Sequence, residues 1–208
     1  MTGKGQPHLT QNSAQSARLS VDGLACVRGG RMLFSGISFD LAAGEALILA
    51  GPNGVGKSSL LRLIAGLLPP FAGHVVHTGR LALADEMTAL DPRLPLASAL
   101  GFWAQLDGAT ASDVATALDL FDLSHLADVP VRMLSTGQRR RATLARTAAS
   151  RAEIWLLDEP GNGLDHASHA RLEAAMAAHQ AGGGIVVAAS HQPLGLNNAR
   201  HLVLEAAA

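Results

Sequence analysis

The sequence predicts an α/β fold with a mostly parallel sheet, and two observations support this class. Short apolar segments alternate along the chain with longer segments of helical periodicity, which is the order expected when helices connect parallel strands. The apolar segments are themselves continuous: residues 185–189 read Ile-Val-Val-Ala-Ala, which is typical of a strand covered on both faces. The 208 residues suit a single domain, which we expect over residues 18–208.

The expected elements follow in chain order from these two patterns. Continuous or alternating apolar segments predict strands at residues 19–24, 37–41, 46–50, 81–84, 154–157, 185–189 and 202–204. Helical periodicity predicts helices at residues 57–68, 111–123, 137–150 and 167–180. The stretch of residues 85–149 has few strand signals, so we expect it to form a helical lobe inserted in the domain.

Composition excludes several classes of protein. The net charge of −1 gives no indication of a nucleic-acid partner. No apolar stretch approaches the ~18 residues that a membrane-spanning helix needs, so we expect no transmembrane segment. Residues 1–17 are polar and rich in glycine, which predicts a disordered tail rather than a secretion signal. The single cysteine, Cys26, allows no internal disulfide and suits a reducing compartment.

A glycine-rich loop between the strand at 46–50 and the helix at 57–68 carries the clearest chemistry. It fits the pattern G-x-x-x-x-G-K-[ST], whose backbone N–H groups and helix N-terminus bind phosphate. Lys57 is expected to reach the β- and γ-phosphates and to take part in catalysis, and the Ser58 hydroxyl to bind Mg²⁺. The candidate nucleotide-binding residues of this loop are Gly51, Pro52, Asn53, Gly54, Val55, Gly56, Lys57, Ser58 and Ser59.

Two carboxylates end the apolar strand at residues 154–157. The carboxyl end of a parallel strand lies beside the phosphate loop, so Asp158 is placed to hold Mg²⁺ through water. Glu159 is placed to orient and polarise the attacking water. Such an acidic pair is a weak signal alone, because it also caps turns, but it gains weight beside a phosphate loop.

The segment Leu134-Ser135-Thr136-Gly137-Gln138 opens a basic helix and resembles the LSGGQ signature of the ABC ATPase family. The resemblance implies a P-loop NTPase fold with an N-terminal antiparallel β part and an inserted helical subdomain. It also implies a head-to-tail homodimer, in which Ser135 and Gly137 contact the γ-phosphate of ATP held by the opposite subunit. The basic run Arg139-Arg140-Arg141 can be a solvated face of this helix, and that explanation is at least as good as a functional one.

Two further segments match this family. Leu164 and Asp165 stand where members carry a loop between the two ATP sites, although the glycines before them are unusual. His191 follows the strand at 185–189 and corresponds to the family's switch histidine, which implies a catalytic role in placing Glu159 and the water.

Two positions depart from the family pattern. Glu86 falls near the place of a usual glutamine between the core and the helical lobe, where a carboxylate can approach Mg²⁺ or be a plain surface charge. Arg28 falls where members usually stack an aromatic ring on adenine. A guanidinium plane can take that role, so we expect Arg28 to bind the base, although a solvated arginine in a hairpin turn is the alternative.

One short segment indicates which group of the ABC ATPase family the sequence resembles. Ser190-His191-Gln192-Pro193-Leu194 resembles the ATPase subunit of the cytochrome c maturation system, the haem exporter. The resemblance implies ATP hydrolysis with Mg²⁺, an integral membrane permease as partner, and a peripheral location on the cytoplasmic face of the inner membrane. An ATPase for another transported substrate, a soluble ABC ATPase acting on ribosomes or DNA, and a nucleotide-binding module without hydrolysis remain as alternatives.

Overall fold

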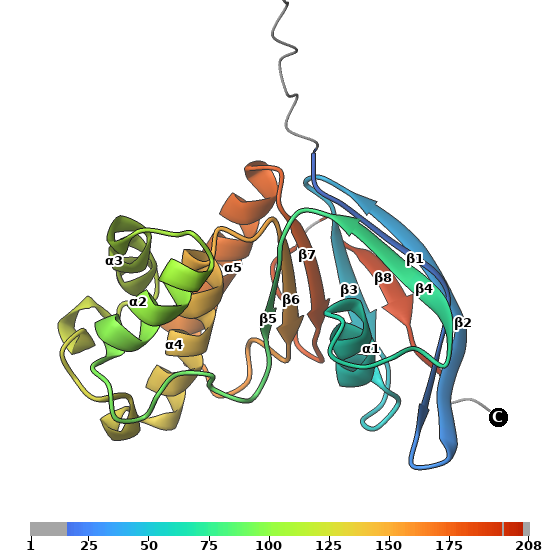
Figure 1. The fold of residues 1–208 in the computed structure, drawn as a ribbon, viewed down its shortest axis with the longest axis horizontal. Coiled ribbons are helices and arrows are strands. Elements are labelled where there is room, and N and C mark those ends of the chain that lie inside the picture. Colours follow the sequence, from blue (N-terminus) through green and yellow to red (C-terminus); the bar gives the residue numbers. More distant parts are fainter. Residues whose placement is uncertain (1–15, 197, 206–208) are drawn as a thin grey trace, which may run out of the picture.

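Two sheets lie on either side of helix α1 (Lys57–Ile64), and the remaining helices cover the outer face of the larger sheet (Figure 1). This arrangement comes from a computed structural model that describes residues 16–196 and 198–205. A disordered tail was expected at residues 1–17, and residues 1–15 of that stretch lie outside the described residues. Ala17, at its end, is buried in the core between the sheets.

The larger sheet is parallel, as predicted. Its order is β5-β6-β7-β3-β8, and every neighbouring pair runs in the same direction. Its central strands are buried on both faces because alternate side chains enter different cores: Ile154 and Leu156 face α1, whereas Trp155 and Leu157 face the helices on the other side. The strands are β3 (Ala46–Ala50), β5 (Leu81–Ala84), β6 (Ile154–Asp158), β7 (Ile185–Ala189) and β8 (Arg200–Val203).

The smaller sheet is antiparallel and has the order β2-β1-β4. Its strands are β1 (Arg18–Arg28), β2 (Arg31–Ala42) and β4 (Ala72–Thr78). The predicted strands at 19–24 and 37–41 were too short, because Gly29 and Gly30, both with positive φ, allow β1 to turn directly into β2. Strand β4 was not predicted, because its mostly exposed sequence, with two histidines, lacks an apolar pattern.

Helix α1 ends at Ile64, four residues before the predicted end at residue 68. Gly66 takes a positive φ of 71° just after the helix. The Leu67 N–H donates to the Arg62 carbonyl at 2.9 Å, and the Gly66 N–H donates to the Leu63 carbonyl at 3.0 Å. These two bonds form a Schellman motif, which terminates the helix.

The helices on the other side of the parallel sheet include a lobe at its β5 edge (Figure 1). Helix α2 (Leu96–Leu106) was not among the predicted helices, although it falls in the expected helical stretch. In the part of the chain that the structure describes, no helix is both long enough and apolar enough to cross a membrane. The other helices are α3 (Ala111–Leu120), α4 (Thr136–Ala149) and α5 (His166–Ala181), with short 3₁₀ turns at Ser124–Leu126 and Val131–Met133.

Candidate nucleotide site

The candidate site lies at the carboxyl edge of the parallel sheet, where four strands end side by side. The phosphate loop follows β3, Glu86 follows β5 by two residues, Glu159 follows β6, and His191 follows β7 by two residues. Because all four strands are parallel, their carboxyl ends meet at one edge, which is where α/β sheets bind ligands.

The phosphate loop needs its glycines at two positions. Gly51 has φ 131°, and a Cβ atom there would lie 2.4 Å from the Leu204 carbonyl oxygen. Gly56, with φ 114°, directly precedes α1, and a Cβ atom there would lie 3.0 Å from the Phe34 ring. Any side chain at either position would therefore distort the loop that presents the N-terminus of α1.

Lys57 is 93% buried, since its exposed fraction is 7%, and its ammonium group stays within the loop. The Nζ atom donates to the Gly51 carbonyl at 2.8 Å and to the Pro52 carbonyl at 3.3 Å. It also lies 3.0 Å from His191 Nε2. A buried cation at a helix N-terminus, surrounded by backbone amides, is a strong site for a polyphosphate.

Three polar side chains converge on the imidazole of His191. Its Nε2 atom lies 2.8 Å from Asn53 Oδ1 and 3.2 Å from Glu159 Oε1. Its backbone N–H donates to Glu159 Oε2 at 3.4 Å. With Nε2 unprotonated, the ring accepts from Lys57; with Nε2 protonated, it donates to Asn53 or Glu159. His191 therefore connects the phosphate loop to Glu159.

Glu159 holds an unusual backbone conformation. Its φ of 47° lies in the left-handed region, which costs free energy in a residue with a side chain. Its N–H donates to the Ala189 carbonyl at 2.8 Å, which continues the pairing of β6 with β7 by one residue. Asp158, the preceding carboxylate, is 5% exposed.

A cavity of about 440 Å³ opens between these groups. It brings most of the predicted phosphate-loop residues together with the two catalytic candidates and Glu86. The residues that line it are Leu33, Asn53, Gly54, Gly56, Lys57, Ser58, Ser59, Glu86, Glu159, Asn162 and His191. Among the described residues, these predicted site residues lie outside that lining: Gly51, Pro52, Val55, Asp158, Arg28, Ser135 and Gly137.

Ser135 and Gly137 lie at the start of helix α4 and are not among the residues that line this cavity. Ser135 is exposed and caps the helix: its hydroxyl accepts from the Gln138 N–H at 3.2 Å, and its own N–H donates to the Gln138 side chain at 2.7 Å. Gly137 lies against the loop after β6, because a Cβ atom there would be 3.3 Å from the Gly163 carbonyl oxygen.

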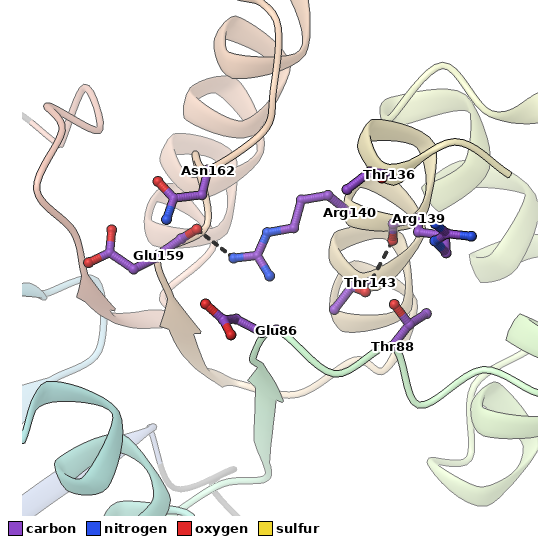
Figure 2. A pocket seen from close by; sticks show the side chains of 8 residues that line it. All are labelled: Glu86, Thr88, Thr136, Arg139, Arg140, Thr143, Glu159 and Asn162. Carbon is purple, nitrogen blue, oxygen red and sulfur yellow. Dashed lines mark hydrogen bonds between the residues drawn. The ribbon is translucent and has the colours of Figure 1, made fainter.

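The interpretation of Arg139–Arg141 as a solvated helix face was wrong for two of the three arginines. Arg141 donates to the carbonyls of Phe121 and Asp122 inside the helical lobe. Arg140 extends from α4 toward Glu159 and lines, with Glu86, Glu159 and Asn162, a second cavity of about 230 Å³ (Figure 2). No signal in the sequence singled out Arg140, since three consecutive arginines leave open which one faces inward.

Arg28 lies at the exposed end of β1, where it pairs across the hairpin with Arg31. Its charge acts on Cys26: burial raises the pKa of that thiol, while Arg28 and a hydrogen bond with Ser59 oppose the rise. Ser59 lines the main cavity, so Arg28 belongs to the same end of the molecule as the phosphate loop.

The residues present suit a nucleoside triphosphate with a divalent cation. Gly51 and Gly56 shape a loop that a Cβ atom would fill, and the buried Lys57 supplies positive charge within it. Ser58 and the buried Asp158 offer the oxygen ligands that Mg²⁺ prefers.

Residues 34–162 match the family described as ABC transporter. The chain is 56% identical to the cytochrome c biogenesis ATP-binding export protein CcmA of Sphingopyxis alaskensis, over 89% of this chain and 96% of that protein. It is 52% identical to the protein of the same name from Zymomonas mobilis, over 91% of this chain and 86% of that protein.

Solved structures show the same fold. A metal-chelate type ABC transporter in an inward-facing conformation aligns with a TM-score of 0.76 and 27% identity, over 92% of this chain and 80% of that chain. The ATP-binding subunit of another ABC transporter aligns with a TM-score of 0.81 and 22% identity, over 90% of this chain and 85% of that chain. The predicted fold class is thereby confirmed. The chain belongs to the ABC transporter family, within its group of cytochrome c biogenesis ATP-binding export proteins, and is an ATP-binding and ATP-hydrolysing subunit.

Proposed function

We propose that this protein hydrolyses Mg²⁺-ATP as a head-to-tail homodimer bound to an integral membrane permease, and that this cycle supports haem delivery for cytochrome c maturation. The observation that carries the proposal is the meeting of Lys57, Glu159 and His191 at one cavity, with Glu159 Oε1 3.2 Å from His191 Nε2. A cation for phosphate, a carboxylate for water and an imidazole between them are the groups that phosphoryl transfer to water requires.

Each group has a separate task in the proposed reaction. Lys57 and the N–H groups of the phosphate loop bind the phosphates and offset their negative charge. Ser58 and Asp158 would hold Mg²⁺, which would offset the negative charge of the phosphates. Glu159 orients the water and accepts its proton, and His191 keeps the Glu159 carboxylate at the phosphate loop. Glu86 lines the same cavity, which favours the reading in which its carboxylate approaches Mg²⁺.

The exposed position of Ser135 supports the dimer. The Ser135 side chain is exposed at the N-terminus of α4, and Ser135 is not among the residues that line the Lys57 cavity. An exposed helix N-terminus with a capping serine is instead suited to the phosphate of ATP held by a second copy.

Mixing two inactive variants tests this arrangement. Ser135→Arg breaks the helix N-terminus, and Lys57→Ala breaks the phosphate loop. In a head-to-tail pair of one subunit of each kind, one site is intact and the other is doubly broken. We expect the mixture to regain up to about a quarter of wild-type ATPase activity, because random pairing makes half of the dimers mixed. If the mixture hydrolyses ATP no faster than either variant alone, the head-to-tail arrangement is wrong.

The membrane partner and the haem pathway are supported by likeness to proteins named for export in cytochrome c biogenesis. We propose that the protein binds the cytoplasmic face of the inner membrane through its permease. Purification of the protein from membranes, with identification of any polytopic protein that stays bound, separates this proposal from a soluble ABC ATPase. A host that lacks the protein should fail to mature c-type cytochromes; normal cytochromes in that host would point to another transported substrate.

Arg28 is proposed as the platform for adenine. Loss of its stacking should reduce ATP affinity by ~2- to 30-fold, which corresponds to about 0.5–2 kcal/mol. We therefore expect Arg28→Ala to bind ATP more weakly and Arg28→Tyr to restore binding, since a ring offers the same plane. Titration at two salt concentrations separates stacking from attraction to phosphate, because the latter fades more with salt. Unchanged affinity in Arg28→Ala would show that the base is held elsewhere.

A further inference from the structure

The side chain of Arg140 joins three segments that meet at the candidate site. Its Nη2 atom donates to the carbonyls of Asp158 and Glu159, both at 2.5 Å, and its Nη1 atom donates to the Asp85 carbonyl at 2.8 Å. Figure 2 shows this side chain crossing from α4 toward Glu159, with Glu86 nearby. One guanidinium therefore ties helix α4, which begins at the Ser135 cap, to the end of β6 and to the loop after β5.

These bonds are made in a confined and acidic environment. Burial lowers the pKa of Arg140, and the charges of Asp158, Glu86, Asp85 and Glu159 oppose that effect, in decreasing order. An arginine keeps its proton in such surroundings, so the group remains a cation facing four carboxylates. Among the described residues, its buried Nε atom has no hydrogen-bond partner. The buried Nε atom of Arg146, on the same helix, is unsatisfied in the same way, so what distinguishes Arg140 is the set of carbonyls to which its guanidinium donates.

The bond to Glu159 bears on a strained residue. With φ at 47°, the Glu159 backbone stays in the left-handed region only because its surroundings hold it there. Its N–H is held by the Ala189 carbonyl at 2.8 Å, and its C=O by Arg140. These two bonds fix the peptide groups on either side of the Glu159 Cα atom, whose carboxylate contacts His191.

We propose that Arg140 is a positioning residue for hydrolysis, which fixes the Glu159 carboxylate at the phosphate loop and couples it to the loop that carries Glu86. Movement of the helical lobe would then move the base that polarises water. Arg140 acts through Glu159, so this inference rests on the catalytic role proposed for that residue.

The matched test compares Arg140 with Arg146, which lies on the same helix. Arg146 is also buried and donates to a backbone carbonyl, that of Leu83 at 2.6 Å, but its guanidinium lies over the Trp103 ring, 5.1 Å from the ring centroid, and not at Glu159. Lysine at either position keeps the charge and loses the planar fork that reaches several carbonyls at once. The comparison uses the full chain, with kcat, ATP affinity and thermal unfolding measured for each variant.

We expect Arg140→Lys to lower kcat ~10-fold or more and Arg140→Ala ~100-fold, because a misplaced catalytic group loses about that much rate. The affinity for ATP should change less than ~3-fold in both, since positioning acts on the transition state. Arg146→Lys should lower thermal stability by about as much as Arg140→Lys does, but its kcat should stay at the wild-type value. A fall in kcat of equal size in Arg146→Lys would reduce Arg140 to a structural role.

Glu159→Gln, measured alongside, separates two failures. In the first case, Glu159→Gln is inactive, whereas Arg140→Lys is folded and turns over ATP like wild type. Arg140 then does not position the base, and this inference alone is overturned. If Glu159→Gln turns over ATP like wild type, the catalytic role of Glu159 and the inference fall together.

Discussion

Replacing Glu159 with Gln is expected to lower ATP turnover by about 10²–10⁴-fold while leaving ATP binding intact. The Glu159 side chain is 15% exposed and lies 3.2 Å from His191 Nε2 at the edge of the cavity. Glutamine keeps the size and the hydrogen-bonding reach of the side chain, but it cannot take a proton from water. The buried Lys57 and the phosphate loop are unchanged, so the nucleotide still binds. Steady-state turnover and ATP titration of the same preparation measure the two effects.

The control for this substitution is Glu173→Gln on helix α5. Glu173 pairs with His169 at 3.5 Å, away from the lining of the cavity, so the same change in charge should leave turnover within about 2-fold of wild type. Turnover at the wild-type rate in Glu159→Gln would contradict its assignment as the residue that polarises water.

Replacing Lys57 with Ala is expected to weaken the binding of Mg²⁺-ATP itself, by ~10- to 100-fold. Hydrogen bonds to a charged group are worth about 1.5–3 kcal/mol, and each 1.4 kcal/mol is a factor of ten in affinity. Lys57 is the buried cation of the loop, and its loss also removes the donor that the Gly51 carbonyl uses at 2.8 Å. Isothermal titration with Mg²⁺-ATP measures the affinity directly.

Arg18→Ala provides the control for the loss of one positive charge. Arg18 forms an exposed pair with Asp40, in which its side chain is 69% exposed. An exposed pair contributes little, so ATP affinity should stay within about 2-fold of wild type. Equal affinity in Lys57→Ala and wild type would be incompatible with a phosphate-binding loop at residues 51–58.

The parallel sheet could be predicted because its signals are local. Residues 185–189 were predicted with the boundaries that the structure has, since a strand buried on both faces is apolar at nearly every position. Residues 81–84 were also predicted with the right boundaries, because they are all apolar although the strand lies at the edge of the sheet and is only partly buried. Strand β4 escaped prediction for the opposite reason: it pairs at the edge of the small sheet, and most of its side chains are exposed. Its place depends on pairing with β1, which no local pattern reveals.

In the candidate site, too, residues in local motifs could be predicted, whereas contacts between distant segments could not. The phosphate loop, Glu159 and His191 were found from motifs, and the structure brings them together at the edge where the strands end. The contact of Asn53 with His191 joins residues 138 positions apart, and that of Arg140 with Asp85 joins residues 55 positions apart. Such contacts depend on how the layers pack, so the contacts of Arg140 could not be predicted from the sequence.

The central claim is that two copies of this chain close on ATP, and the mass of the Glu159→Gln variant in solution tests it most directly. Light scattering should give the monomer mass of 21.4 kDa without nucleotide. With Mg²⁺-ATP the mass should double, because nucleotide is bound but not hydrolysed, and adding Lys57→Ala to the same chain should abolish the doubling. A mass that stays at the monomer value in saturating Mg²⁺-ATP would contradict the shared sites on which the proposed function depends.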